Sequence, residues 1–292
     1  MLGDAFYEVF KAEHHLFCSD KEPTNEWQQE LDFRDSDRYR ESVNEFSPDA
    51  LFHLGAYTSL EYCERNVQDA YLTNLNSVET AVSISNDLDI PLLYISTAGI
   101  FDGQQSTYDD WDVPNPLGVY ARTKYLAERY VVENARKYFV CRAGWMMGGG
   151  PRKDKKFINK LAQQLYQGRR VIHVVNDKDG TPTYTLDFAK TVKQLLPTRR
   201  WGVFNMVCGG QTSRLEVAQE MIDILGLSGD VDIQPVTSNH FAGEYFAPRP
   251  PSERLINAKL DLLGINMMSD WKESLRSYLG EHFKDLFKDR AD

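Results

Sequence analysis

Short apolar runs alternate with amphipathic helical stretches through the first half of the chain. The runs at 50–54 (ALFHL), 91–97 (PLLYIST) and 138–142 (YFVCR) have the length and residue types of buried parallel strands. Between them, residues 60–88 and 118–137 repeat apolar side chains at helical spacing. This strand–helix–strand repetition predicts an α/β fold with a doubly wound parallel sheet. A ligand is then expected at the carboxyl ends of the strands.

The pattern changes after residue 144. A glycine-rich, basic stretch, MMGGGPRKDKK, is typical of a loop. The apolar runs and helical stretches that follow predict a mixed α/β lobe. We therefore expect residues 1–144 to form one domain and residues 145–292 a smaller lobe, partly interleaved with the first. The elements expected there are helices at 156–167 and 213–225, strands at 170–175, 202–207 and 231–235, and two final helices.

The amino end, MLGDAFYEVFKAEHHLFCSD, has the order of a dinucleotide-binding unit: a helix, an apolar run and then an acid, Asp20. Such a unit opens with a strand and a glycine-rich turn, of which only Gly3 matches the last glycine. We therefore expect the sequence to start late, by roughly a dozen residues. Asp20 favours a free ribose 2′-hydroxyl and hence NADH, whereas Lys21 beside it suits the 2′-phosphate of NADPH.

Composition and charge limit the kinds of partner and ligand that the protein can bind. The chain has 292 residues and a formal net charge of −10, which argues against nucleic acid as a partner. No stretch approaches the ~18–20 apolar residues of a membrane span. The four cysteines are widely spaced, with no CxxC pair or Cys/His cluster, so we expect no metal site. Buried, reduced thiols in a cytoplasmic protein are the simpler interpretation.

The sharpest chemical signal is the segment YARTKYLAERYV, in which Tyr120 and Lys124 are four residues apart. A helix places both on one face, and an ammonium near a phenol lowers the tyrosine pKa from about 10. Such a tyrosine exchanges a proton with a carbonyl or alcohol oxygen. The spacing alone recurs by chance, but Thr97 ends a predicted strand upstream and can hydrogen-bond the same oxygen. Ser96 is its neighbour, and strand alternation points it to the other side.

Segments along nearly the whole chain add to this signal. They are LDFRD, SPDALFHLGAYTSLEYCERNVQDAYLTN, FVCRAGWMMGGGPRKDKKF, VVNDKDGTPTYTLDFA, GVFNMVCGGQTSRLEVA and APRPPSERLINAKL. In these segments and their order, the chain resembles the dTDP-4-dehydrorhamnose reductase family of the extended short-chain dehydrogenase/reductases. The resemblance implies a Rossmann-like NAD(P)-binding domain over residues 1–144 and a sugar-nucleotide-binding lobe over residues 145–292.

The resemblance also implies an activity, the NAD(P)H-dependent reduction of the C4 keto group of a nucleotide-linked 4-keto-6-deoxy sugar, dTDP-4-dehydro-L-rhamnose first. Tyr120 would give a proton to the C4 oxygen, Lys124 would hold the nicotinamide ribose and lower the tyrosine pKa, and Thr97 would orient the carbonyl. The residues implied at the NADPH or NADH cofactor are Gly3, Asp20, Asp32, Phe33, Gly55, Ala56, Tyr57, Asn74, Tyr120 and Lys124.

On the substrate side, the resemblance implies Thr97, Trp145, Thr181, Pro182, Thr183 and Arg249. Trp145 would pack on the sugar, and Arg249 would bind the diphosphate or nucleotide as a bidentate donor. The three residues from Thr181 would shape the wall near the sugar. Without the resemblance, a tryptophan in the core and an arginine in a surface ion pair are the alternatives.

One departure from the family concerns the two residues after Thr97. The family usually carries Asp-Tyr there, and these residues help to read the sugar. Here Ala98 and Gly99 stand in their place. We therefore expect a wider and less polar pocket at this point, which leaves the exact 4-keto sugar open and argues against a dehydratase.

Two alternatives to this reductase remain. One is a nucleotide-sugar epimerase or a reductase of another 4-keto sugar, which Ala98 and Gly99 favour. The other is a non-catalytic, nucleotide-binding regulatory subunit on the same fold, like the regulatory subunit of methionine adenosyltransferase, which the incomplete glycine-rich turn favours. The expected partner is a nucleotide-sugar, with neither nucleic acid nor membrane, and a homodimer is left open.

Overall fold

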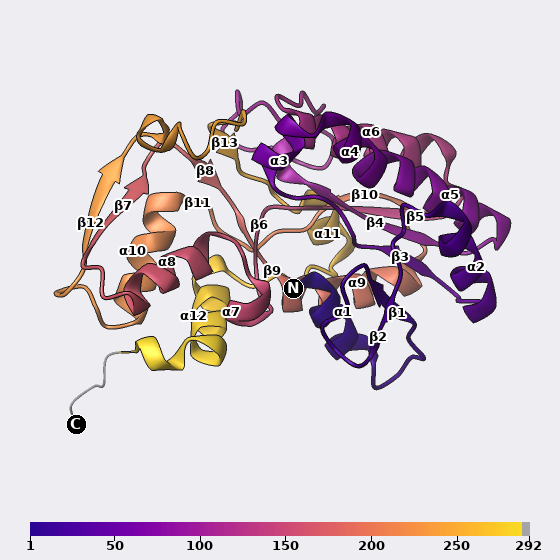
Figure 1. The fold of residues 1–292 in the computed structure, drawn as a ribbon, viewed down its shortest axis with the longest axis horizontal. Helices are drawn as coiled ribbons and strands as arrows, with labels where there is room; N and C mark the ends of the chain where they lie inside the picture. Colours follow the sequence, from indigo (N-terminus) through magenta and orange to yellow (C-terminus); the bar gives the residue numbers. More distant parts are fainter. Residues whose placement is uncertain (288–292) are drawn as a thin grey trace.

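The computed structural model describes residues 1–287, which form two lobes around a cleft (Figure 1). The first lobe is built on a parallel four-stranded sheet in the order β10-β5-β4-β3. Its strands are β3 (Leu51–His53), β4 (Leu92–Thr97), β5 (Tyr138–Ala143) and β10 (Gly202–Asn205). The three apolar runs of the first half thus form adjacent parallel strands, as the sequence pattern predicted.

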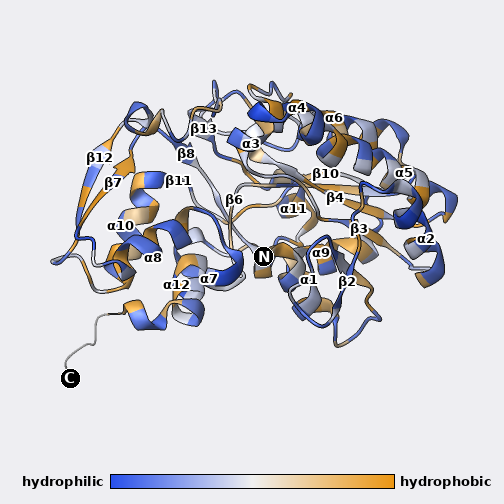
Figure 2. Cartoon of the chain, viewed as in Figure 1, coloured by the Kyte–Doolittle hydropathy of each residue, from blue (hydrophilic) through white to orange (hydrophobic). Residues whose placement is uncertain are grey.

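Helices cover both faces of this sheet, because β4 is apolar on both sides. Leu92 and Tyr94 pack into one cluster with α2 (Ser36–Phe46), α5 (Ser77–Asp87) and α6 (Val119–Asn134). Leu93 and Ile95 pack into the other cluster with α1 (Leu2–Phe10) and α9 (Thr185–Leu195). The strands are correspondingly orange in the hydropathy colouring (Figure 2). The predicted doubly wound α/β architecture is confirmed.

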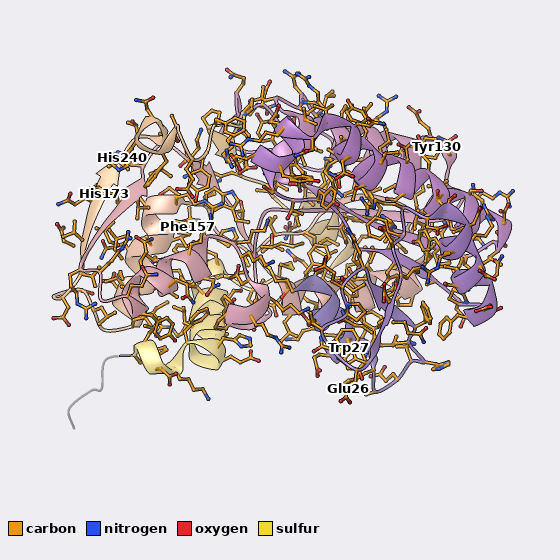
Figure 3. All side chains as sticks on the ribbon, viewed as in Figure 1. Glu26, Trp27, Tyr130, Phe157, His173 and His240 are labelled. Atoms are coloured by element: carbon orange, nitrogen blue, oxygen red, sulfur yellow. The ribbon has the colours of Figure 1, made fainter. Side chains whose placement is uncertain are left out.

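The amino-terminal strands stand apart from the central sheet. β1 (Cys18–Asp20) pairs with β2 (Gln28–Glu30) as a separate two-stranded sheet. Within residues 1–287, β3 pairs with β4 alone, so its other edge carries no strand. Trp27, which directly precedes β2 (Figure 3), ties this small sheet to α1, because its ring stacks on Tyr7 with centroids 4.1 Å apart.

The long helical stretch expected at 60–88 is divided into shorter pieces. Asn66, with non-helical dihedral angles, separates the first two of them. A π-helical turn then precedes α5, and such turns commonly lie at functional sites. The pieces are α3 (Leu60–Arg65), α4 (Val67–Tyr71) and η1 (Leu72–Asn76).

The second lobe carries three small sheets. β6 (Trp145–Met147) pairs with β9 (Pro182–Tyr184), and β7 (Val171–Val175) pairs with β12 (Asp232–Val236). In the third sheet, β8 (Asp179–Gly180) lies between β11 (Thr212–Ser213) and β13 (Ser252–Glu253). The helices are α7 (Gly150–Lys153), α8 (Phe157–Tyr166), α10 (Arg214–Ile224), α11 (Ala258–Leu263) and α12 (Trp271–His282).

Strand β10 lies beyond residue 144 in sequence, yet it extends the sheet of the first lobe. All four cysteines are free thiols, and Cys63, Cys141 and Cys208 are buried, as their apolar surroundings predicted. None of the helices within residues 1–287 is long and apolar enough to cross a membrane.

Candidate active site

A cleft of about 2330 Å³ is lined by both lobes. The carboxyl ends of β3, β4 and β5 reach it through Gly55, Thr97 and Gly144. The second lobe contributes residues of β6, α8 and the loops around them. The cleft therefore lies at the edge of the sheet where the doubly wound topology predicts a ligand.

The amino end of α6 places two of the predicted catalytic residues. Gly118 is the N-cap of this helix, and the Glu64 carboxylate accepts a hydrogen bond from the Val119 amide at 2.7 Å. A carboxylate at this position satisfies an amide that the helix itself leaves unpaired. Tyr120 and Lys124 follow one turn apart, and both line the cleft. Glu64 lies in one of the segments that resemble the family, and nothing in the sequence pattern indicated that it caps this helix.

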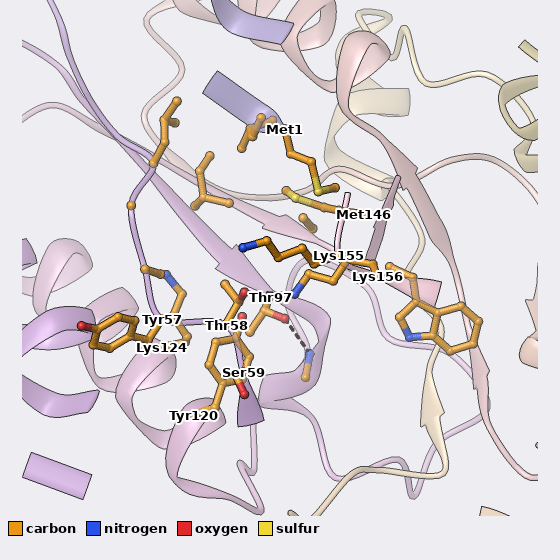
Figure 4. Close-up of a pocket in the computed structure, with 18 of the residues that line it drawn as sticks. Met1, Tyr57, Thr58, Ser59, Thr97, Tyr120, Lys124, Met146, Lys155 and Lys156 are labelled. Atoms are coloured by element: carbon orange, nitrogen blue, oxygen red, sulfur yellow. Dashed lines mark hydrogen bonds between the residues drawn. The ribbon is translucent and has the colours of Figure 1, made fainter. Parts of the chain in front are cut away.

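Thr97 lies beside Tyr120 in the same wall (Figure 4). Its hydroxyl accepts a hydrogen bond from the Gly99 amide at 3.2 Å. Burial raises the pKa of Tyr120 to about 12, although the nearby Thr97 hydroxyl acts to lower it. The expectation that Lys124 lowers the tyrosine pKa is wrong for this structure, because desolvation of the phenol dominates.

The environment of the Lys124 amine explains why this residue has little effect on the Tyr120 pKa. The side chain is only 4% exposed, and its ammonium lies over the Tyr94 ring, 4.2 Å from the centroid. Burial lowers the pKa of Lys124 to about 7, and the Glu128 carboxylate partly opposes this shift. Glu128 is itself held by Arg142, with 2.6 Å between Oε1 and Nη2. The lysine is thus only partly charged near neutral pH.

Most of the residues predicted to bind the cofactor line the cleft, and all of them belong to the first lobe. At Gly55, the Phe33 ring occupies the space that a Cβ would need. The guanidinium of Arg34, paired with Asp32, holds the pKa of that carboxyl below its ordinary value. The predicted cofactor residues found in the lining are Gly3, Asp20, Asp32, Phe33, Gly55, Ala56, Tyr57, Tyr120 and Lys124.

Asn74, predicted at the cofactor, is not among the residues that line the cleft. Its side chain is 1% exposed and holds the loop after β3 from behind. Oδ1 accepts from the Tyr57 amide at 2.7 Å, and Nδ2 donates to the Tyr57 carbonyl at 3.1 Å and to Thr123 at 3.2 Å. Through these hydrogen bonds, Asn74 positions the backbone of Tyr57, which itself lines the cleft.

The predicted substrate residues divide in the same way. Trp145, Pro182 and Arg249 line the cleft. Thr181 and Thr183 are fully buried: Thr181 accepts from the Leu255 amide at 3.2 Å, and Thr183 accepts from the Gly144 amide at 2.8 Å. Both hydroxyls thus accept hydrogen bonds from backbone amides, and neither threonine is among the residues that line the cleft.

Arg249 and Trp145 each have a protein partner. Arg249 Nη1 lies 2.7 Å from Glu61 Oε1, so the arginine is already ion-paired at the rim of the cleft. Trp145 Nε1 donates to Glu253 Oε2 at 2.6 Å. The Arg214 guanidinium lies over the Trp145 ring, 3.7 Å from its centroid.

The structure adds cleft residues that sequence reasoning did not single out. Lys155 and Lys156 extend into it across from Thr97 (Figure 4), and Lys156 Nζ donates to Thr58 Oγ1 at 3.0 Å. Their only signal was the basic loop MMGGGPRKDKK, which predicted a loop and nothing more. Arg214 and Glu253 gave no signal, because only the tertiary fold brings them to Trp145.

The pocket beside Gly99 is more polar than the sequence led us to expect. A Cβ built on Gly99 would lie 3.1 Å from Glu253 Oε1 and 3.5 Å from Thr97 Oγ1. A carboxylate from the second lobe therefore borders the space that the small residues leave. The prediction of a less polar pocket at this point is wrong, since charge from β13 replaces side chains missing after β4.

Comparison with known families agrees with this geometry. A family model described as RmlD substrate binding domain matches residues 1–283. The chain belongs to this family.

This RmlD-family chain is similar to named proteins and to solved structures. A dTDP-4-dehydrorhamnose reductase of Aggregatibacter actinomycetemcomitans is 26% identical over 257 residues, 85% of this chain and 86% of that protein. A crystal structure of dTDP-4-dehydrorhamnose reductase from Bacillus anthracis in complex with NADP is 27% identical with a TM-score of 0.85, covering 96% of this chain and 95% of that one. Methionine adenosyltransferase 2 subunit beta of Bos taurus is 24% identical over 96% of this chain and 85% of that protein.

Proposed function

We propose that this protein reduces the C4 keto group of a nucleotide-linked 4-keto-6-deoxy sugar with NAD(P)H, with dTDP-4-dehydro-L-rhamnose as the first candidate. The observation that carries the proposal is the meeting of Thr97, Tyr120 and Lys124 in one wall of a cleft that Trp145 and Arg249 line from the other lobe. Relatives named dTDP-4-dehydrorhamnose reductase support the substrate class.

The proton chemistry follows from the pKa values. With its pKa raised to about 12, the Tyr120 phenol keeps its proton at neutral pH and is ready to donate it to the C4 oxygen. The Thr97 hydroxyl, beside it, donates a hydrogen bond to the same oxygen and orients the carbonyl. Lys124, whose pKa burial lowers to about 7, lies one helical turn after Tyr120 on α6.

The cleft also suits a dinucleotide. The first residues of α1, from Met1 to Gly3, line it, and amides at a helix amino end attract phosphate. A Cβ on Gly3 would meet nothing within 4 Å, so there is room for a ligand there. Asp20 lines the cleft at the end of β1, where it would bind a ribose hydroxyl, and Lys124 would hold the nicotinamide ribose. The nicotinamide would supply the hydride.

Lys21 lines the cleft next to Asp20, so both NADH and NADPH remain candidates. On the substrate side, Trp145 offers an aromatic face to the sugar. Arg249 would bind the diphosphate by exchanging its ion pair with Glu61 for the ligand, and Lys156 adds a second positive charge to the lining of the cleft.

The test is a spectrophotometric assay with NADH or NADPH and dTDP-4-dehydro-L-rhamnose. We expect turnover that falls by about 10²–10⁴-fold in Tyr120→Phe, because the phenol supplies the general acid. Tyr130→Phe is the matched control, since Tyr130 lies on the same helix away from the cleft (Figure 3). Turnover in the wild type with equal rates in Tyr120→Phe would refute the assigned role.

Two alternatives have distinct outcomes in the same assay. A regulatory subunit, which the relatives named methionine adenosyltransferase 2 subunit beta support, would bind NAD(P)H and reduce no 4-keto sugar nucleotide. An epimerase or a reductase of another sugar would leave dTDP-4-dehydro-L-rhamnose unchanged and act on a different sugar nucleotide.

A further inference from the structure

The three-stranded sheet β11-β8-β13 brings two charged side chains to Trp145 from opposite sides. Gly180, in the central strand, pairs with Thr212 on one side and with Glu253 on the other. Its missing side chain matters, because the Trp145 indole occupies the space that a Cβ on Gly180 would need. The indole therefore lies across the strand.

Glu253 and Arg214 fix the indole from its edge and its face. The indole N–H donates to Glu253 Oε2 at 2.6 Å. The Arg214 guanidinium lies 3.7 Å from the Trp145 ring centroid and 4.9 Å from that of Phe157 on α8. Burial lowers the pKa of Arg214 to about 10, and the nearby Glu253 carboxylate opposes this shift, so the arginine stays charged at neutral pH.

The second carboxylate oxygen of Glu253 lies beside Gly99 and not beside the indole. Glu253 Oε1 and Thr97 Oγ1 both lie within 3.5 Å of the point where a Cβ on Gly99 would stand. Thr97 and Glu253 both line the cleft, and the Glu253 charge also acts on the Tyr120 phenol by raising its pKa. One oxygen thus anchors the indole, while the other borders the place where the sugar would react.

We propose that Glu253 is a specificity-determining residue that accepts a hydrogen bond from the sugar hydroxyl next to the C4 carbonyl. The proposal rests on the reductase function above. A 4-keto-6-deoxy sugar linked through C1 carries hydroxyls only at C2 and C3, and only the C3 hydroxyl adjoins the ketone. A carboxylate accepts hydrogen bonds and cannot donate them, so it selects a hydroxyl at this position over hydrogen.

Gly99 leaves the space that the Glu253 carboxylate occupies. A Cβ there would approach Glu253 Oε1 to 3.1 Å, closer than ordinary van der Waals contact, and a longer side chain would take the space of the carboxylate. Gly99 therefore admits Glu253, and the sugar is read by a residue of the second lobe.

The experiment compares two nucleotide-linked 4-keto-6-deoxy sugars, one with a C3 hydroxyl and one that is 3-deoxy, in the wild type and in Glu253→Gln. Glutamine keeps an oxygen for the Trp145 N–H but presents an amide donor in place of the second acceptor. We expect the wild type to prefer the hydroxylated sugar by about 10- to 100-fold in kcat/KM, as for a hydrogen bond to a charged group. In Glu253→Gln the ratio of kcat/KM values for the two sugars should fall by about three- to tenfold, because the amide bonds the hydroxyl without a charge. Effects of the substitution through Trp145 or Tyr120 act on both sugars alike and leave this ratio unaltered.

Glu273→Gln is the control, because Glu273 is exposed on α12 outside the cleft and carries the same substitution. It should keep the wild-type preference. An equal loss for both sugars in Glu253→Gln would mean that Glu253 only supports Trp145, and this would overturn the proposal. An unchanged preference would overturn it as well, while leaving the reductase function intact.

If the wild type reduces neither sugar, the proposed function fails, and binding decides the role of Glu253. Calorimetry would then measure affinities of the corresponding C4 alcohols, with and without the C3 hydroxyl, for both proteins. A hydroxyl preference that is weaker in Glu253→Gln than in the wild type supports the proposal. Equal preferences in both proteins refute it.

Discussion

Lys124 gives the sharpest test of the electrostatics, because replacing it should abolish activity and yet stabilise the fold. Lys124 is 4% exposed, and its ammonium has no ion pair of its own among residues 1–287. Lys124→Met keeps the length and apolar character of the side chain and removes the charge. The substitution therefore isolates the cost of burying this amine.

The size of the effect follows from the pKa shift. Burial lowers the pKa of Lys124 from 10.5 to about 7. At 1.36 kcal/mol per unit, the amine destabilises the folded state by about 5 kcal/mol at pH values below 7, where it must be charged in both states. Between pH 7 and 10.5 the unfolded chain binds more protons than the folded one, so this penalty shrinks as pH rises. At pH 9 about 2 kcal/mol remains.

The cation–π contact with Tyr94 offsets about 1 kcal/mol of the penalty when the amine is charged. We therefore expect Lys124→Met to raise the free energy of unfolding by about 4 kcal/mol at pH 6 and about 2 kcal/mol at pH 9. The measurement is urea unfolding without ligand at several pH values, followed by tryptophan fluorescence.

Lys137→Met is the matched control. Lys137 pairs with Asp89 at the surface, 2.8 Å apart, and such pairs contribute about 0–1 kcal/mol. The reasoning is refuted if Lys124→Met destabilises the protein at pH 6, or if its gain in stability does not change between pH 6 and pH 9.

Two further substitutions test the packing around the site. Glu128→Gln leaves Arg142 buried without a charged partner and should lower the free energy of unfolding by about 3–5 kcal/mol, whereas Glu133→Gln, in an exposed pair on the same helix, should lower it by less than about 1 kcal/mol. Similar urea midpoints for these two variants would contradict the role assigned to the buried pair. Gly55→Ala should lower the free energy of unfolding by about 1–3 kcal/mol, because its Cβ would displace the Phe33 ring. An unchanged melting temperature would show that the ring moves without strain.

The order of elements was readable from the sequence because each depends on local pattern. Apolar runs such as 91–97 became strands buried on both faces, and the helical stretch at 118–137 became α6 with Tyr120 and Lys124 one turn apart. The order of segments also indicated the family. Local pattern could not show that Cys18–Asp20 pairs outside the central sheet, because pairing depends on which strands are nearby.

The sequence by itself therefore determined the α/β class, the family and the residues that gather at the ends of the strands. Tertiary structure alone decided which polar groups reach the cleft: Asn74, Thr181 and Thr183 form hydrogen bonds within the protein, while Glu253 reaches the space beside Gly99. It also reversed the expected pKa of Tyr120. The physical reason is that burial and hydrogen-bond partners are set by residues distant in the chain, and periodicity carries information only about neighbours.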